Sequence, residues 1–207
     1  MADDRQFFAA YRPRPLMDLT TYLLLFRGVG GATKLPVAPL KEALTKAGFK
    51  NATTYISSGN ALVRSTLSRE EMIAKVAALC KKKFAFDKAI FAPTAAEWKA
   101  VMNSNPFPNA TATPSLLHAA LLEGVPTATA MKALLGVAVE GEQLKVIEGG
   151  PSARFGGYSV AYIHTPSGFG TSKLAAKFDK GLGVVNTARN WNSVLKLHAL
   201  AQELEAL

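Results

Sequence analysis

Short apolar runs alternate with amphipathic stretches in the first hundred residues, and their order predicts a sheet-and-helix unit. Residues 20–27 are rich in β-formers and end in glycines, which is typical of a buried strand that leaves through a turn. The next stretch begins at Pro36, repeats its apolar residues at helical spacing and stops at Gly48, so it predicts a helix. Two β-prone runs, 53–56 and 61–64, flank a Ser-Ser-Gly-Asn turn and predict a hairpin.

A second helix and a fourth strand complete this unit. Ser68 and Glu71 have the spacing of a capping box, and apolar residues follow them at helical spacing. Residues 86–91 predict the closing strand. The order strand-helix-strand-strand-helix-strand is that of a ferredoxin-like fold, in which helices cover one face of an antiparallel sheet.

The remaining pattern predicts a decorated copy of the first unit. A short helix over 94–102 leads into a linker over 103–114, which is rich in Asn, Pro, Thr and Ala. Strands are predicted near 115–122, 137–139, 143–147 and 158–164, and helices over 127–135, 172–180 and 189–204. The predicted class is therefore α+β with two ferredoxin-like halves, 19–105 and 106–207, the second ending in a C-terminal helix. The proline-interrupted segment 1–18 predicts a flexible extension.

Composition removes several classes of protein. Hydrophobic residues make up 49% of the chain and charged residues 19%, which suits a folded core and not a disordered chain. No apolar run approaches the roughly 20 residues of a membrane helix, and no secretory signal is evident, so we expect a soluble cytoplasmic protein with no membrane partner. Cys80 is the only cysteine, which excludes an internal disulfide, and its helical apolar stripe predicts a buried thiol.

Positive charge is concentrated in the first half. The formal net charge is +9, and residues 1–105 contain 16 Lys and Arg against 8 Asp and Glu. A basic half can attract nucleic acid, phosphorylated metabolites or acidic partners, and charge alone does not choose among them.

The glycine-rich segment 27–34 lies between a predicted strand and a predicted helix, where backbone N–H groups can turn toward an anion. It is not a Walker A loop, because Thr33 precedes the lysine where glycine belongs and Leu35 replaces the magnesium-binding Ser or Thr. A dinucleotide fingerprint is also incomplete, since its third glycine is missing. Two interpretations stay open, an anion-binding loop and a turn that only reverses the chain.

Several separated motifs resemble one family. They are Phe26-Arg27-Gly28, Lys34-Leu35-Pro36 and residues 54–60 in the first half, and Asn105-Pro106-Phe107-Pro108, Ser172-Lys173-Leu174 and residues 187–192 in the second. Together they resemble the bacterial family called domain of unknown function 1697. The resemblance implies a fold of ferredoxin-like type and no established reaction, so it supplies no catalytic residues.

The inventory of catalytic residues is poor. His118, His164 and His198 lie far apart and lack the spacing of metal ligands, and no carboxylate pair suggests a general acid and base. We therefore expect no metal and no cofactor, and the sequence leaves open whether the protein is an enzyme.

Cations at predicted helix starts give a further indication of a site. Lys34, Lys173 and Arg189 fall there, although the helix dipole disfavours a cation by about 0.3–1 kcal/mol at that position. A shared anion would explain the placement, whereas exposed cations in water cost little. We hypothesise a polar, anion-accepting cleft between the halves that binds a small anionic or phosphorylated ligand. The candidate residues are Arg27, Gly28, Gly30, Gly31, Lys34, Ser58, Asn60, Ser172, Lys173, Arg189, Asn190 and Asn192.

Two alternatives belong to other classes. Ferredoxin-like sheets can display aromatic residues to RNA, and Tyr22, Phe26, Tyr55 and Phe91 are candidates for stacking on bases, supported by the basic first half. No RNP1-like run accompanies them. The other alternative is a structural or interaction module, which the sequence neither supports nor excludes.

Overall fold

The protein has a mixed α+β architecture. The computed structural model describes residues 19–30, 33–57, 59–150 and 154–207, and these form two four-stranded antiparallel sheets and six α-helices. This confirms the α+β class. The extension 1–18 and two candidate site residues, Gly31 and Ser58, lie outside the described residues. None of the described helices has the length and apolar character needed to cross a membrane.

The first sheet has its strands in the order β2-β3-β1-β4. These strands are β1 (Thr20–Phe26), β2 (Lys50–Thr54), β3 (Asn60–Ser65) and β4 (Ile90–Phe91), and the connecting helices are α1 (Val37–Lys46) and α2 (Arg69–Phe84). In β1, alternate side chains point to opposite faces: Tyr22, Leu24 and Phe26 pack in the core beneath the two helices. Leu23 and Leu25 point the other way, into a second core. The run is apolar throughout because both of its faces are buried.

The second sheet repeats this strand order as β6-β7-β5-β8. Its elements are β5 (Leu117–Leu122), β6 (Gln143–Ile147), β7 (Ser159–His164), β8 (Asn186–Asn190), α4 (Ala128–Leu135) and α5 (Lys173–Gly181). The β5 side chains also alternate: Ala120 and Leu122 face a core that contains residues of both helices, and Ala119 and Leu121 face the central core. The second half thus has two buried sheet faces as well.

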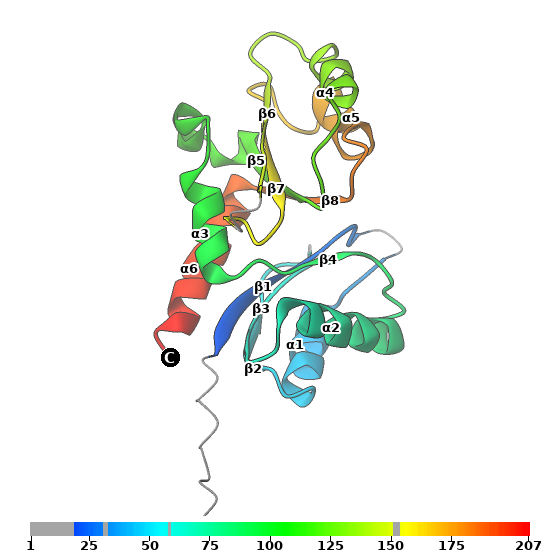
Figure 1. Ribbon diagram of the computed structural model, residues 1–207, viewed down its shortest axis with the longest axis vertical. Coiled ribbons are helices and arrows are strands. Elements are labelled where there is room, and N and C mark those ends of the chain that lie inside the picture. Colours follow the sequence, from blue (N-terminus) through cyan, green and yellow to red (C-terminus); the bar gives the residue numbers. More distant parts are fainter. Residues whose placement is uncertain (1–18, 31–32, 58, 151–153) are drawn as a thin grey trace, which may run out of the picture.

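A central core between the sheets joins the two halves. Helices α3 (Ala95–Asn103) and α6 (Trp191–Glu205) run beside both sheets (Figure 1) and contribute Trp98, Val101, Trp191 and Leu197 to this core. The Trp98 indole donates a hydrogen bond to the Val194 carbonyl at 3.1 Å, which fixes α3 against α6. The last helix, although it follows the second sheet, therefore covers the first sheet as well.

Local signals in the sequence set several helix starts. Capping boxes are present at Ser68 with Glu71 and at Thr94 with Glu97, so each helix begins where two backbone N–H groups gain side-chain acceptors. The predicted capping box of α2 is confirmed. Cys80 is buried in this helix, as predicted, and burial raises the pKa of its thiol to about 11.

Three predicted elements differ from the structure. The strand predicted over 86–91 shrinks to Ile90–Phe91, because Phe86 instead packs its ring against Phe26 at 5.6 Å between centroids. Residues 137–139 form no strand, since the N–H groups of Val137 and Ala138 bond back to the end of α4. The predicted linker contains a 3-10 helix, Pro108–Ala112, and a second one, Pro114–Leu116, begins at its last residue.

The largest difference concerns the start of the last helix. The sequence predicted a helix over 189–204, but residues 186–190 pair with β5 as the edge strand β8. The helix begins at Trp191, and the Asn190 side chain accepts a hydrogen bond from the Ser193 N–H at 3.0 Å. Arg189 is therefore a strand residue and not a helix-start cation.

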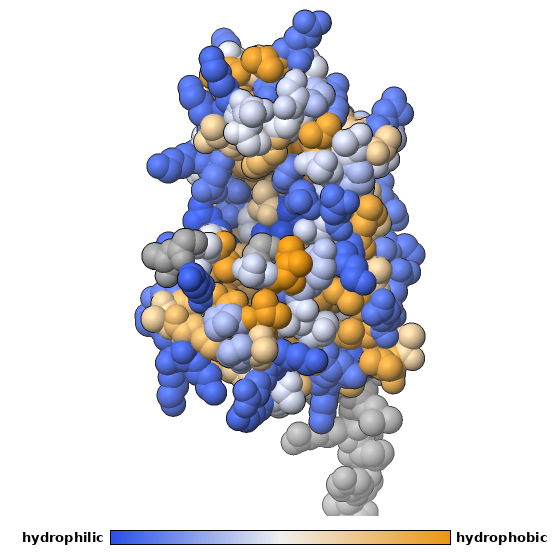
Figure 2. Space-filling view, turned by 180° about the vertical axis from the view of Figure 1, so that it is seen from behind, coloured by the Kyte–Doolittle hydropathy of each residue, from blue (hydrophilic) through white to orange (hydrophobic). Residues whose placement is uncertain are grey.

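The face of the molecule that is turned away in Figure 1 is mostly polar. Seen from behind, the face of the molecule is largely hydrophilic and its hydrophobic residues lie in separate patches (Figure 2). Isolated exposed apolar residues are normal in globular proteins, so this face alone does not identify a partner.

Leu197→Ala tests whether α6 stabilises the whole molecule. Leu197 is fully buried in the central core, so its truncation should cost about 2–5 kcal/mol of unfolding free energy. The matched control is Leu195→Ala on the same helix, whose side chain is 40% exposed and whose loss should stay within about 0.5 kcal/mol. Denaturant titration measures both variants. Equal losses would contradict a central core that depends on one face of α6.

Candidate functional site

Arg189 crosses the junction between the halves from the edge strand β8. Its Nε donates to Asn60 Oδ1 at 2.5 Å, and its Nη2 donates to the carbonyls of Phe26 and Gly59 at 3.2 and 2.9 Å. Its Nη1 bonds within its own strand, to Thr187 Oγ1 and the Ala188 carbonyl. All five guanidinium N–H groups therefore have acceptors, and the side chain orders the end of β1 and the hairpin of the first half.

Gly59 makes this approach feasible. Its φ of +78° is a left-handed conformation that favours glycine, and an added Cβ would collide with the side chain of Val29. Its carbonyl accepts both from the Phe26 N–H and from Arg189. A glycine at this position thus keeps the hairpin close enough to receive the arginine.

Arg27 crosses the same junction in the opposite direction. From the end of β1, its Nε donates to the Asn186 carbonyl at 2.9 Å, and its Nη2 contacts both carboxylate oxygens of Asp179 at 2.9 and 3.0 Å. The side chains of this ion pair are 33% and 58% exposed, so the pair contributes little stability. The two halves thus exchange arginines at this junction.

A third arginine joins the halves elsewhere. Arg69, the first residue of α2, pairs with Glu97 of α3 and donates to the carbonyls of Ala92 and Gly156. It also lies over the Tyr158 ring, 5.7 Å from the centroid. Because Gly156 and Tyr158 belong to the second half, this contact supports the junction at a second point.

The three arginines differ in their counter-ions. Arg69 faces Glu97 and Arg27 faces Asp179, whereas Arg189 has only neutral acceptors among the described residues. Its side chain is buried, and desolvation lowers the pKa of its guanidinium to about 10. A buried charge without a counter-ion is costly, so Arg189 combines a structural role at the junction with a charge that no carboxylate among the described residues neutralises.

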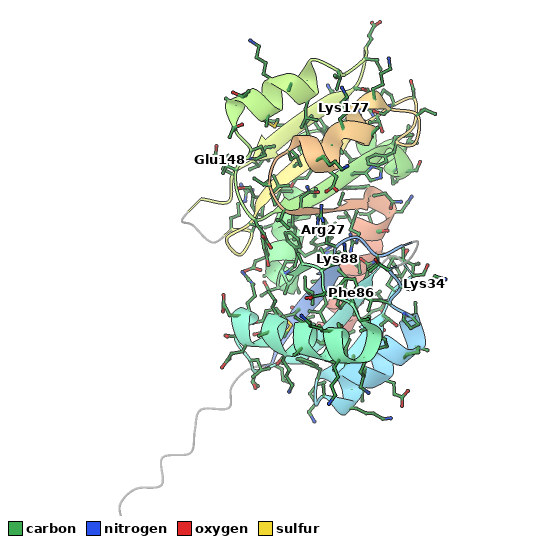
Figure 3. All side chains as sticks on the ribbon, turned by 90° about the vertical axis from the view of Figure 1, so that its right-hand side faces the viewer. Arg27, Lys34, Phe86, Lys88, Glu148 and Lys177 are labelled. Carbon is green, nitrogen blue, oxygen red and sulfur yellow. The ribbon has the colours of Figure 1, made fainter. Side chains whose placement is uncertain are left out.

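A cleft of about 360 Å³ opens beside these arginines. Its polar wall contains Arg27, Asp179, Asn186, Thr187 and Arg189. Its remaining wall is Phe26, Gly28, Val29, Phe169, Ala175, Phe178 and Ala188. Its lining residues come from 26–29 and from 169–189. Figure 3 shows Arg27 between the two sheets, with Lys88 close to it and Lys177 above it on α5.

Not every candidate residue reaches this cleft. Arg27, Gly28 and Arg189 line it, and Asn60 lies buried behind Arg189. Gly30 and Lys34 line a different cavity of about 260 Å³ together with Ser57. The other four residues lie at helix starts: Ser172 and Asn190 cap α5 and α6, Lys173 is exposed as the first residue of α5, and Asn192 is exposed on α6.

Sequence reasoning missed several residues of the junction. Asp179, Phe169 and Phe178 complete the cleft, and no motif pointed to them. Arg69 carried a signal, because a cation in the first turn of a helix opposes the dipole. Arg69, as the first residue of α2, opposes the dipole of its helix in the same way as Lys173 does in α5.

His118 contacts Phe169, one of the residues that line the cleft. Its ring stacks on Phe169 with 3.9 Å between centroids, and its Nδ1 is buried without a hydrogen-bond partner among the described residues. Burial lowers the pKa of the imidazole to about 4, so the ring is neutral at pH 7. The neutral ring supports Phe169 as an aromatic wall.

The aromatic residues considered for RNA binding are unavailable as a stacking surface. Tyr22, Phe26 and Phe91 are buried, and Tyr55 packs partly against the central core. The sheet face that such proteins present to RNA is covered here by α3 and α6 (Figure 1). That route to base stacking is therefore wrong for this chain. The described residues contain no group of three or more His, Cys, Asp or Glu arranged for a metal ion.

Comparison with known proteins establishes the family. The family model described as protein of unknown function (DUF1697) matches residues 19–150, more than half of the chain, so the chain belongs to this family. The family that the sequence motifs suggested is confirmed; the motifs over 172–174 and 187–192 lie beyond the matched residues. A solved structure, the conserved bacterial protein SP0830 from Streptococcus pneumoniae, matches with a TM-score of 0.67 and 18% identity, over 89% of this chain and 99% of that one. At this identity the likeness concerns the fold alone. No curated protein matches the chain.

Arg189→Lys tests the role of the buried guanidinium. Lysine keeps the charge but cannot reach five acceptors, so buried carbonyls lose partners and we expect a loss of about 2–4 kcal/mol. Arg27→Lys is the matched control, and its partly exposed ion pair should cost less than about 1 kcal/mol. Denaturant unfolding compares them. A smaller loss for Arg189→Lys than for the control would argue against the junction described above.

His118→Gln tests the imidazole. The folded pKa of about 4 lies below the ordinary 6.5, so the unfolded chain binds a proton first as the pH falls. The stability contributed by the neutral ring is present above about pH 6.5 and is lost toward pH 4, by about 3 kcal/mol in total. The variant should lack this part of the acid destabilisation. Parallel pH profiles of unfolding free energy for both proteins would contradict the assignment.

Proposed function

We propose that this chain is a binding protein whose cleft between the halves accepts a small anionic ligand. The observation that carries the proposal is the buried Arg189, which lines the cleft and has no carboxylate partner among the described residues. We also propose that each half, 19–105 and 106–207, is a ferredoxin-like unit. The matching strand orders β2-β3-β1-β4 and β6-β7-β5-β8 support that division.

Charge in the cleft favours an anion. Its ionisable lining residues are Arg27, Arg189 and Asp179, which leaves one positive charge in excess. The Arg189 donors are fully used, so this residue acts through its charge. A ligand anion in the cleft would supply the counter-charge that the protein lacks.

Arg27 is the direct donor. Its Nε and Nη2 bond to the second half, and its Nη1 has no partner among the described residues. The side chain is 33% exposed, so the amino group can meet a ligand without leaving its present position. A guanidinium edge of this kind suits carboxylate and phosphate oxygens.

The edge of β8 adds backbone donors. The Val185 carbonyl accepts from the Glu123 N–H at 3.0 Å, so the backbone groups of residue 185 point toward β5. Because this direction alternates along an antiparallel pair, the N–H and carbonyl groups of residues 186 and 188 point away from β5. Their carbonyls accept from Arg27 and Arg189, as this geometry requires. The Ala188 N–H then points outward from the edge at the cleft wall, where an anion can accept from it.

Asp179 limits the affinity of the cleft for an anion. Its carboxylate competes with any anion for the Nη2 of Arg27 and cancels one positive charge. Because this side chain is 58% exposed, removal of its charge should hardly affect the fold.

Asp179→Asn should tighten anion binding by about 3–10-fold, because the variant frees Arg27 and raises the net charge of the cleft. Isothermal titration with inorganic phosphate measures the change. Asp87→Asn is the matched control: Asp87 pairs with Lys81 on the surface and 72% of its side chain is exposed, so the same charge change occurs away from the cleft.

Two results would contradict the proposal. One is the absence of phosphate binding at millimolar concentration in both the natural chain and Asp179→Asn. The other is an equal gain for the two Asn variants, which would mean that binding responds only to total charge.

A further inference from the structure

We propose that the ligand is an organic anion with a ring-bearing apolar body and one anionic head, either a carboxylate or a phosphate monoester. This inference rests on the proposed anion cleft and narrows the class of ligand. The observation behind it is that the two walls of the cleft differ: the polar wall has one positive charge in excess, and the other wall is apolar and contains aromatic rings.

The cleft is poorly suited to a polyphosphate. Its charged lining residues leave only one positive charge in excess. In the described part of the glycine segment that follows β1, Gly30 and Thr33 bond to each other: their N–H groups and carbonyls exchange hydrogen bonds of 2.7 and 2.9 Å. The N–H groups of Gly30 and Thr33 are therefore already committed, and one head group matches the available charge.

The apolar wall favours a ligand that has an apolar part in addition to its anionic head. Phe169 and Phe178 of the second half face the cleft together with Phe26 and Val29 of the first half. Phe26 and Phe178 are almost fully buried, and Val29 and Phe169 are partly exposed. Inorganic phosphate would leave the exposed parts of Val29 and Phe169 in contact with water, whereas a ring would cover them. The volume of about 360 Å³ lies at the lower end of the range for small-molecule sites, which suits one ring and a short polar head.

Phe169 is preorganised for contact with a ligand ring. Its ring is partly exposed, and its packing against the neutral His118 at 3.9 Å between centroids limits its rotation. A preformed aromatic wall loses little conformational freedom on binding. In the expected pose the head meets Arg27 and the Ala188 N–H, and the ring lies against Phe169.

The test compares matched probes on the whole chain. Phenyl phosphate and 3-phenylpropionate carry both parts, inorganic phosphate and acetate carry only the head, and benzyl alcohol carries only a ring. Isothermal titration should show the two organic anions binding at least about tenfold more tightly than any single-part probe. The stronger of the two identifies the preferred head group.

Phe169→Leu should weaken the organic anions by about fivefold or more while leaving inorganic phosphate unchanged, because only the ring contact is lost. Phe107→Leu is the matched control, since Phe107 lines a different cavity. Ala188→Leu, which fills the cleft from β8, gives a second variant if Phe169→Leu unfolds at the assay temperature.

The outcomes separate the two proposals. Equal affinity for inorganic phosphate and phenyl phosphate would overturn the ring-bearing ligand and leave the anion cleft standing. Benzyl alcohol binding as tightly as the organic anions, or no binding by any probe, would overturn both. An equal loss in the Phe107 and Phe169 variants would overturn the assigned location.

Discussion

The structure depends on the burial of both faces of each sheet. A four-stranded sheet with two helices on one face leaves its other face apolar, as Leu23 and Leu25 of β1 demonstrate. Here the two uncovered faces share one core, which α3 and α6 complete. Neither half can expose this face without bringing a large apolar surface into water. The position of every polar group at the junction follows from this packing, because the shared core fixes how the sheets approach.

Polar contacts at the junction are reciprocal. Arg27 of the first half reaches the carbonyl of Asn186, and Arg189 of the second half reaches the carbonyl of Gly59. These contacts also protect an edge: the outward carbonyls of β8 accept from guanidinium groups, so β8 is less able to pair with another chain. The same geometry leaves a cleft where β8 passes the end of β1. Packing of the halves and formation of the cleft are thus consequences of one arrangement.

Local chemistry determined how much of this could be predicted. The capping box at Ser68 and the alternation in β1 are encoded within a few residues, and both appear as expected. Strand β8 was missed because Asn-Thr-Ala-Arg-Asn has few β-formers, and it becomes a strand through pairing with the distant β5. The structure brings Arg27, Asn60 and Arg189 together at the junction, whereas Lys173 is exposed at the start of α5, outside the lining of the cleft. Asp179 and Phe169 join the cleft through tertiary contacts that no sequence spacing records.

Arg189 connects the stability of the fold with the proposed binding. Its five hydrogen bonds satisfy the donors of the guanidinium but leave its charge unneutralised, and burial keeps that charge away from water. An anion beside Arg27 would reduce this electrostatic cost only while the halves remain packed, since the cleft wall comes from both of them. Binding would then stabilise the junction itself by linkage, because the separated halves offer no such site. An unpaired charge at an otherwise well-satisfied junction is therefore a reason to expect a ligand there, and not a defect in the packing.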